Sequence, residues 1–511
     1  MKYVYTFLGI LGFLAGSAQQ EAKIFQNFKA DKANSILPDF SYVGYHCGER
    51  PLESKKNVEV FDVINYGAIP DDIISDKQAI MRAIAAAEKA GGGIVFFPKG
   101  KFLVQEDTDS ATSIWISKSN IIFRGSGSGK GGTELFMKNP LKPADPEKMW
   151  TVPPLFIFGS KKGERNIGKI VADSKTGSFE IMVDKSTGLK ENDWIMLEMK
   201  SKDLASIKLD LGNHEVSPAW KSLNENGIEL KMYYQVKKIA GNQITLVQPL
   251  AYPVNSSLDW KVSKFNAIEE VGIENIAFAG NWKAPFVHHR SWLDDSGFTL
   301  VNMRRMVNSW MKNCRFTNVS IACVINSGAN ISVLDCVITG NGGHEAVANA
   351  GGTNILLGRI IDEASMWHSV GTSKTSMNTV VWRVTYPVTT CFESHASQPR
   401  NTLLDNVIGG LMQNRGGGAL VNMPNHMRNL VMWNYTQTND AIKDFEFWPS
   451  GSIWWKIPNP IIVGFSGKET TFQKEQVGYM ESIGKFVTPG SLYEAQLKLR
   501  LGRLPDWMIE K

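Results

Sequence analysis

A short pattern of apolar and polar positions recurs seven times between residues 271 and 435. Each copy places apolar or small residues four and two positions before a polar anchor and one position after it, as Val271, Ile273 and Ile276 do around Asn275. Alternation at period two predicts a β-strand with one buried face, and the anchor predicts a bend where the strand ends. The seven anchors are Asn275, Asn313, Asp335, Arg359, Arg383, Asn406 and Asn434.

The distance between anchors indicates how these strands are arranged. Successive anchors are 38, 22, 24, 24, 23 and 28 residues apart. A β-rich unit of this length, too short for a helical pair, is typical of a solenoid in which each copy forms one coil. We therefore predict an all-β protein whose residues at offsets −4, −2 and +1 face inward. Side chains at one offset in neighbouring coils should lie about 4.8 Å apart, so the repeat predicts which distant residues meet.

Nine residues after successive anchors, the same angular position of the coil carries groups capable of chemistry. His344, His368 and Arg415 occupy this offset, Glu345 follows it, and the coil between the last two brings Glu393 and His395 close to it. Imidazoles serve as general acids and bases near neutral pH, and a guanidinium binds carboxylates. We predict a substrate-binding column in which His344, His368, His395 and Arg415 are catalytic and Glu345 and Glu393 contact substrate. Exposed histidines without a function are the alternative.

A second cluster falls within the longest spacing, in the sequence from Val287 to Asp295. An enlarged loop just before the histidine column is a natural neighbouring wall, so we predict that His289 or Arg290 contacts substrate. Adjacent histidines rarely ligate one metal ion together, and no cofactor is expected except calcium. The adjacent carboxylates Asp294 and Asp295 are the candidate calcium ligands.

The segments before the repeat predict a covered first coil. Residues 58–162 contain strands near 60–64, 94–97 and 101–104, and a helix from Asp76 to Ala90 that Gly91-Gly92-Gly93 ends. Residues 19–57 read as an irregular N-terminal arm. Residues 1–18 combine Lys2, an apolar stretch and small residues, which predicts a signal peptide and a periplasmic or secreted protein.

The remaining segments predict an insertion and a second cap. Residues 163–265 interrupt the repeat and read as an inserted β-rich subdomain, in which the charged connection 201–230 is interpreted as a mobile flap. The coils continue over 266–465, and 466–511 forms a C-terminal cap. A capping box from Ser491 to Glu494 there begins a helix, which we expect to cover the last coil.

One stretch carries a family resemblance. Residues 61–68 (FDVINYGA), the Ala- and Ile-rich helix after them and residues 91–100 (GGGIVFFPKG) resemble the N-terminal signature of pectate-lyase-like proteins. The resemblance implies a right-handed parallel β-helix and a protein that cuts, modifies or binds carbohydrate. The chain also resembles exported Bacteroidetes enzymes that degrade acidic polysaccharides such as ulvan.

Charge and composition indicate which classes of partner the protein can bind. Lys and Arg number 55 against 50 Asp and Glu, a formal net charge of +5, which suits an acidic polysaccharide or oligosaccharide. We expect no nucleic acid partner, because basic runs and zinc-finger spacings are lacking, and no membrane span. The sequence leaves open whether the protein forms a homo-oligomer. Cys314 and Cys336 share one offset and are expected to be buried thiols in neighbouring coils.

The column favours β-elimination among three possible functions. β-Elimination from a uronic acid needs a base, an acid and a cation at the carboxylate, which two or three histidines and Arg415 supply. The leaving group is a sugar for a polysaccharide lyase, or water for a dehydratase acting on a terminal uronate. A glycoside hydrolase would use Glu345 and Glu393 as its two carboxylates. A non-catalytic carbohydrate-binding β-helix would not require the column.

Overall fold

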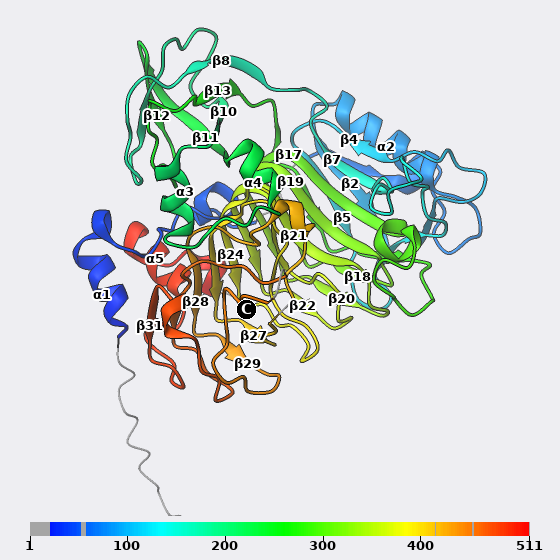
Figure 1. Ribbon diagram of the computed structural model, residues 1–511. Helices are drawn as coiled ribbons and strands as arrows, with labels where there is room; N and C mark the ends of the chain where they lie inside the picture. Colours follow the sequence, from blue (N-terminus) through cyan, green and yellow to red (C-terminus); the bar gives the residue numbers. More distant parts are fainter. Residues whose placement is uncertain (1–20, 53–57, 414, 452–453, 510–511) are drawn as a thin grey trace, which may run out of the picture.

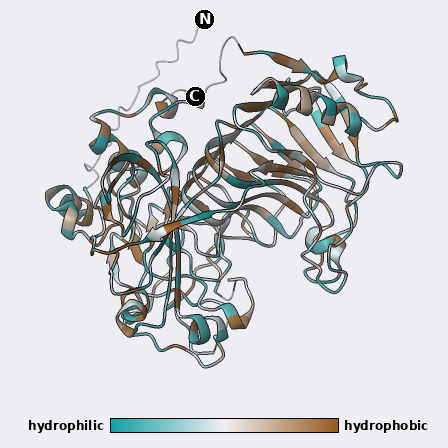
Figure 2. Ribbon diagram, turned by 90° about the horizontal axis from the view of Figure 1, so that it is seen from above, coloured by the Kyte–Doolittle hydropathy of each residue, from teal (hydrophilic) through white to brown (hydrophobic). Residues whose placement is uncertain are grey.

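The computed structural model describes residues 21–52, 58–413, 415–451 and 454–509. The predicted signal peptide, residues 1–18, lies outside them. Parallel strands stack coil upon coil into a right-handed parallel β-helix (Figure 1), so the predicted fold class is confirmed. Hydrophobic residues run along the stacked strands (Figure 2).

The β-helix has three faces, and the first is the longest. Its strands pair in parallel from the N-terminal coil to the C-terminal coil. In order they are β1 (Val60–Asp62), β2 (Gly93–Phe97), β5 (Ile121–Gly125), β15 (Gly272–Glu274), β17 (Thr299–Lys312), β19 (Ile321–Leu334), β21 (Glu345–Gly358), β24 (Met377–Trp382), β26 (Arg400–Asp405), β28 (Leu430–Trp433), β30 (Ile461–Val463) and β31 (Tyr479–Glu481). The last of these adds a coil beyond the predicted end at residue 465.

The second face shares three strands with the first. β17, β19 and β21 bend at Asn308, Asn330 and Asn354, which have positive φ, and their first halves belong to the second face. The other strands of this face are β4 (Ile114–Ile116), β7 (Phe156–Gly159), β23 (Gly371–Ser373) and β25 (Glu393–Ser394).

The third face follows the anchors. It is built from short parallel strands that stack in coil order. They are β3 (Gly100–Val104), β6 (Thr133–Met137), β16 (Ala277–Gly280), β18 (Arg315–Thr317), β20 (Val337–Thr339), β22 (Ile361–Asp362), β27 (Ile408–Gly409) and β29 (Thr436–Gln437).

The seven anchors bend the chain between the first and third faces. All seven have positive φ, between 49° and 57°. This left-handed conformation suits Asn and Asp, and Arg359 holds it while its guanidinium pairs with Asp335 of the preceding coil at 2.6 Å. The residues two positions before the anchors pair in register and are buried, as the repeat predicts.

The first face is buried on both sides, which differs from the single buried face that we predicted. Outward-facing Leu356, Leu403, Trp382 and Trp433 are also buried, because two helices and residues 37–48 cover them. Strands covered on both faces carry continuous apolar runs, and residues 379–382 (TVVW) and 430–433 (LVMW) are such runs. The covering helices are α1 (Lys23–Ala30) and α5 (Leu492–Leu501), which are coloured blue and red in Figure 1.

This cover corrects two expectations about the chain ends. Within the described residues 21–52 of the predicted irregular arm, α1 is a regular helix that buries Ile24, Phe25 and Phe28 against the first face. The Ser491 capping box does begin α5, but α5 lies on the middle coils instead of the last one. The backbone N–H of Leu492 and that of Tyr493 donate to the buried Asp405 carboxylate at 3.0 and 2.9 Å. At the other end, α2 (Lys77–Lys89) packs on β1 and β2.

The segment between β7 and β14 (Ile268–Glu269) forms a separate antiparallel sheet. Its strands are β8 (Arg165–Lys169), β9 (Glu180–Met182), β10 (Trp194–Ser201), β11 (Ile228–Ala240), β12 (Gln243–Leu246) and β13 (Lys261–Lys264). The connection 201–230 contains α3 (Leu204–Leu211) and α4 (Lys221–Asn226). No helix in the described ranges is long and apolar enough to cross a membrane.

The connection 201–230, interpreted from the sequence as a mobile flap, packs against the β-helix in this structure. Leu211, Trp220 and Leu223 join one apolar core with Met423 and Met427 of the β-helix. In the same region the Arg400 guanidinium of β26 donates to the Asp210 carboxylate of α3 at 2.7 Å, and neither side chain is exposed. A buried charge pair and an apolar core together hold these helices in place.

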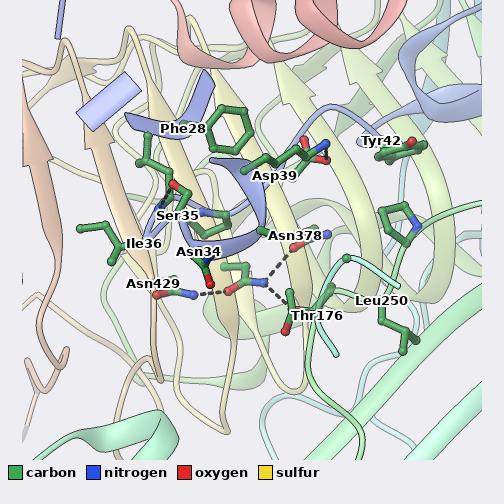
Figure 3. Close-up of a pocket in the computed structure, with 18 of the residues that line it drawn as sticks. Phe28, Asn34, Ser35, Ile36, Asp39, Tyr42, Thr176, Leu250, Asn378 and Asn429 are labelled. Atoms are coloured by element: carbon green, nitrogen blue, oxygen red, sulfur yellow. Dashed lines mark hydrogen bonds and ion pairs between the residues drawn. The ribbon is translucent and has the colours of Figure 1, made fainter. Parts of the chain in front are cut away.

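A cavity of about 560 Å³ lies between residues 28–42, the inserted sheet and the β-helix (Figure 3). On its β-helix side, Asn378, Asn401 and Asn429 form a ladder in which each amide donates to the previous coil at 2.8–3.0 Å. Lys32 and Asp39, which also line the cavity, pair with each other at 2.6 Å. These polar groups of the cavity wall are therefore paired with one another.

Loss of the buried pair should weaken the whole fold. We expect Arg400→Ala to destabilise the protein by about 3–5 kcal/mol, because it leaves the Asp210 carboxylate buried without its cation. The measurement is the urea midpoint together with Tm. Lys169→Ala is the matched control, since Lys169 pairs with Asp259 on the surface and its loss should leave both values unchanged. Equal midpoints for Arg400→Ala and the wild type would contradict this account.

Candidate active site

The start of the second face brings the predicted histidine column together. His368 pairs with Glu345 of the preceding coil, and the backbone N–H of His368 donates to the carbonyl of His344 at 2.7 Å. The ring centres of His344 and His368 lie 4.6 Å apart, and those of His368 and His395 lie 4.8 Å apart. Stacking of consecutive coils therefore places three imidazoles side by side.

The loop before β17 adds two more imidazoles. The His288 ring centre lies 5.5 Å from that of His344 and 5.4 Å from that of His368, and the His289 ring centre lies 5.7 Å from that of His344. We call His288, His289, His344, His368 and His395 the histidine cluster. The sequence pointed to this loop as a neighbouring wall but did not single out His288.

Two buried carboxylates hold the loop against the cluster. Asp294 accepts hydrogen bonds from the backbone N–H of Val287 at 3.0 Å and from the Arg290 guanidinium at 2.8 Å. Asp295 accepts from the backbone N–H of His289 at 3.0 Å and contacts His289 Nδ1 at 2.6 Å. Neither carboxylate is exposed. These contacts favour a positioning role for both carboxylates over the predicted calcium binding.

The same contacts separate the two predicted substrate-binding residues of the loop. The Arg290 guanidinium pairs with the Asp294 carboxylate and donates a hydrogen bond to the Pro285 carbonyl at 3.0 Å. His289 is 52% exposed and stands at the edge of the cluster. His289 is therefore the better placed of the two to meet a substrate.

His368 and Glu393 form a buried dyad. His368 Nδ1 makes a short hydrogen bond to Glu393 Oε2, and their side chains are 8% and 4% exposed. This bond orients the imidazole and directs Nε2 away from the carboxylate. Burial, together with the nearby His344 and Arg415, holds the pKa of His368 well below its usual value. Burial raises the pKa of Glu393 to about 7.

Burial lowers the pKa of two further members of the cluster. Burial lowers the pKa of His395 to about 4, although the Glu393 carboxylate opposes this shift. Burial and the neighbouring His289 lower the pKa of His288 to about 3. Five imidazoles in one place cannot all carry a proton, because each charge repels the next. The resulting unprotonated nitrogens are suited to accept a proton or bind a cation.

Arg415 joins the cluster through Trp367. The Arg415 guanidinium lies 4.1 Å from the centre of the Trp367 ring and donates to the Trp367 carbonyl at 3.2 Å. Trp367 in turn stacks on His288, with ring centres 4.5 Å apart. Sequence reasoning missed Trp367, although its position directly before His368 places it beside the column.

Several polar atoms of the site face no protein partner. His288 Nε2, Glu393 Oε1 and Arg415 Nε are buried without a hydrogen bond, and His344 Nδ1 lies 3.5 Å from Asp295 Oδ1, an ion-pair distance. Native proteins rarely leave such groups unpaired, so their concentration indicates a site built for a ligand.

Glu345 is brought to the same place as His368 by the strand register. Burial raises the pKa of its carboxyl, the nearby Glu393 adds to the shift, and His344 and Lys374 oppose it. The structure thus gathers most of the predicted site residues, while their catalytic and binding roles stay predictions.

Comparisons with known proteins match parts of this architecture. Residues 60–143 match a family described as rhamnogalacturonase A/epimerase, pectate lyase-like. Residues 365–511, which carry His368, Glu393, His395 and Arg415, match a domain of unknown function, DUF4955. Each match covers less than a third of the chain.

The curated relatives match over short stretches. Alginate lyase 7 of Azotobacter vinelandii is 39% identical over 70 residues, which make 14% of this chain and 8% of that protein. Mannuronan C5-epimerase AlgE3 of the same organism is 41% identical over 73 residues, 14% of this chain and 4% of that protein. The chain therefore spans less than a tenth of either relative. Among solved structures, the tailspike gp49 of Pseudomonas phage LKA1 has a TM-score of 0.42 at 12% identity, covering 80% of this chain and 71% of its own.

The electrostatics of the cluster predict how it titrates. With ¹⁵N-labelled histidine, the imidazole signals of His288, His368 and His395 should keep their neutral shifts from pH 8 to about 5.5, whereas urea-unfolded protein should titrate near 6.5. Because the unfolded chain binds these protons first, each residue contributes stability above pH 6.5 that is lost as pH falls toward its folded pKa. Signals of His288, His368 or His395 that titrate near 6.5 in the folded protein would refute this description.

Proposed function

We propose that this protein is a carbon–oxygen lyase that performs β-elimination on a uronic-acid-containing polysaccharide or oligosaccharide. The observation that carries the proposal is the His368–Glu393 dyad beside the Arg415 guanidinium. It supplies an oriented, neutral base next to a permanent cation, and β-elimination from a uronate needs both.

The reaction can be written on the residues of the site. His368 Nε2 takes the proton from C5 of the uronate, and the electron pair of the C5–H bond forms the C4=C5 double bond. The C4–O bond breaks, and the departing oxygen takes a proton from a donor. Arg415, whose Nε lacks a protein partner, binds the substrate carboxylate and stabilises the negative charge that develops there.

Two histidines flank the base and are candidates for the donor. His344 and His395 lie on opposite neighbouring coils of His368, at ring distances of 4.6 and 4.8 Å. A bound uronate brings a negative charge, which raises the pKa of nearby imidazoles and favours the protonated donor. The leaving group is a sugar or water, and both give the same unsaturated uronyl end.

The relatives support an acidic glycan as substrate. One is named an alginate lyase and the other a mannuronan C5-epimerase. An elimination next to a uronate carboxylate and an inversion at C5 both begin with removal of the C5 proton, so one base serves either reaction. Export by the predicted signal peptide would bring the enzyme to such a polymer.

Glycoside hydrolysis is the less favoured alternative. It requires two carboxyl groups at a defined separation, one of them free to protonate the leaving group. Glu345 and Glu393 are the candidates, but Glu393 is bonded to His368 and both are strongly desolvated. The site therefore supports imidazole chemistry better than a pair of carboxylic acids.

A panel of acidic glycans tests the reaction. Absorbance of the conjugated product at about 235 nm should grow with at least one uronate glycan, because elimination joins the new C=C bond to the carboxylate. His368→Ala should lower kcat by about 10²–10⁴-fold as expected for loss of a general base. Arg415→Ala should lower kcat by about 10²–10³-fold and raise KM, because the Arg415 guanidinium binds the substrate carboxylate and stabilises the negative charge that develops there.

The same panel separates the alternatives. His214→Gln is the matched control, since His214 stacks on Trp448 outside the cluster, and its rate and Tm should equal those of the wild type. New reducing ends without absorbance would indicate a hydrolase, and deuterium exchange at C5 without either signal would indicate an epimerase. Binding with none of these signals would indicate a non-catalytic carbohydrate-binding protein.

Glu393 provides a separate test of the dyad. We expect Glu393→Gln to lower kcat by about 10²–10⁴-fold with little change in KM, because the carboxylate acts by orienting the His368 imidazole. Steady-state kinetics on the substrate found in the panel measure this split, and Tm controls for folding. A raised KM with unchanged kcat would instead make Glu393 a substrate-binding residue.

A further inference from the structure

We propose that His288, His289 and His344 bind a divalent transition-metal ion of the zinc class. Adjacent histidines rarely ligate one ion together, but here the loop brings one imidazole nitrogen of His288 and one of His289 within 4.8 Å of each other and of one from His344. Three imidazoles converging from a loop and a neighbouring coil form a donor set that zinc and related ions prefer.

A buried carboxylate supports this ligand set from behind. Asp295 contacts Nδ1 of His289 at 2.6 Å and lies 3.5 Å from Nδ1 of His344. Both contacts occupy the Nδ1 side of the ring, so Nε2 of each histidine is left for a metal. Metal-binding histidines usually donate their other nitrogen to a carboxylate, which fixes the ring and strengthens the ligand.

His288 supplies the third nitrogen. Its Nε2 is buried and makes no hydrogen bond to the protein, while its ring is fixed between His289 and the stacked Trp367. A buried nitrogen without a partner costs free energy unless a ligand meets it. The three imidazoles thus combine an unpaired donor, a ring that the Asp295 carboxylate hydrogen-bonds and a ring that lies within ion-pair distance of the same carboxylate.

A second possible ligand set lies next to this one but suits a metal less well. His368, Glu393 and His395 also bring donor atoms within 4.8 Å of one another. His368 and Glu393 already bond each other, so an ion there would have to break the dyad. In the described structure no hydrogen bond joins His288, His289 and His344 to one another, and an ion at Nε2 of His289 would leave its Nδ1 contact with Asp295 intact.

This inference goes beyond the proposed function and does not depend on it. A three-histidine site leaves one coordination position open, as catalytic zinc sites do. If the protein is a lyase, a cation there would assist Arg415 in neutralising the uronate carboxylate. His344 would then be a metal ligand, and His395 would be the remaining candidate for the proton donor.

Metal content measured without substrate tests the site. Protein dialysed against a chelator and then loaded with Zn²⁺ should retain one equivalent, counted by elemental analysis after gel filtration. His288→Ala and His344→Ala should each lose that equivalent. Asp295→Asn should weaken Zn²⁺ affinity by about 10–100-fold, because it removes the carboxylate behind two ligands.

Two histidine variants serve as matched controls. His214→Gln and His395→Ala should keep the equivalent, because neither removes a proposed ligand. Loss in His395→Ala with retention in His288→Ala would overturn the assignment and place the ion at His368, Glu393 and His395. Retention in His288→Ala and His344→Ala, or no retention by the wild type, would overturn it as well.

X-ray absorption on the zinc-loaded wild type gives a test that needs no variant. The expected spectrum has nitrogen neighbours at about 2.0–2.1 Å and the outer-shell scattering of several imidazoles. A shell of oxygen neighbours without imidazole scattering would contradict the proposal. Because no substrate is present, these results stand apart from the 235 nm assay, and either proposal can fail alone.

Discussion

The hydrogen-bonded register between neighbouring coils is the constraint on which the rest of the molecule depends. It sets the strand residues of one coil against partners in the next, and the left-handed anchors repeat that setting at the corner between the first and third faces. Residues about 24 positions apart are thereby brought within bonding distance of one another. The site is a consequence of this register, since His344, His368 and His395 come from three consecutive coils.

The repeat predicted an all-β solenoid and the column of histidines, and the resemblance of residues 61–68 and 91–100 added the right-handed parallel β-helix. Anchors at Asn275 to Asn434 locate every coil between them, and the offset after each anchor leads to His344 and His368. Features that depend on packing from outside the repeat were not predictable in this way. The helix at Lys23–Ala30 and the position of α5 follow from the outward-facing Trp382 and Trp433, whose apolar character is visible but whose cover is not.

The same limit applies to the loop that carries His288. Its histidines were visible in the sequence, but their approach to the column depends on Asp294 and Asp295 turning inward. Acidic residues in a loop are more often exposed, so their sequence suggested calcium ligands. In the folded chain they are the means by which an irregular loop is given one conformation. Precision at the site thus comes from buried carboxylates that never need to touch a substrate.

Contacts between α5 and residues 41–47 make this solenoid differ from a simple repeat array in its stability and folding. In a simple repeat array each coil contacts only its neighbours, so stability and folding behave as a one-dimensional series. Here the Tyr493 hydroxyl donates to the carbonyl of Val43 at 2.8 Å, and the Arg500 guanidinium reaches the carbonyls of Ser41 and Cys47. Contacts across about 450 residues raise the contact order and join the coils they cover into one cooperative unit. A linear array usually frays from its ends. Here the contacts between the segments around Val43 and Tyr493 oppose fraying of the coils that they cover.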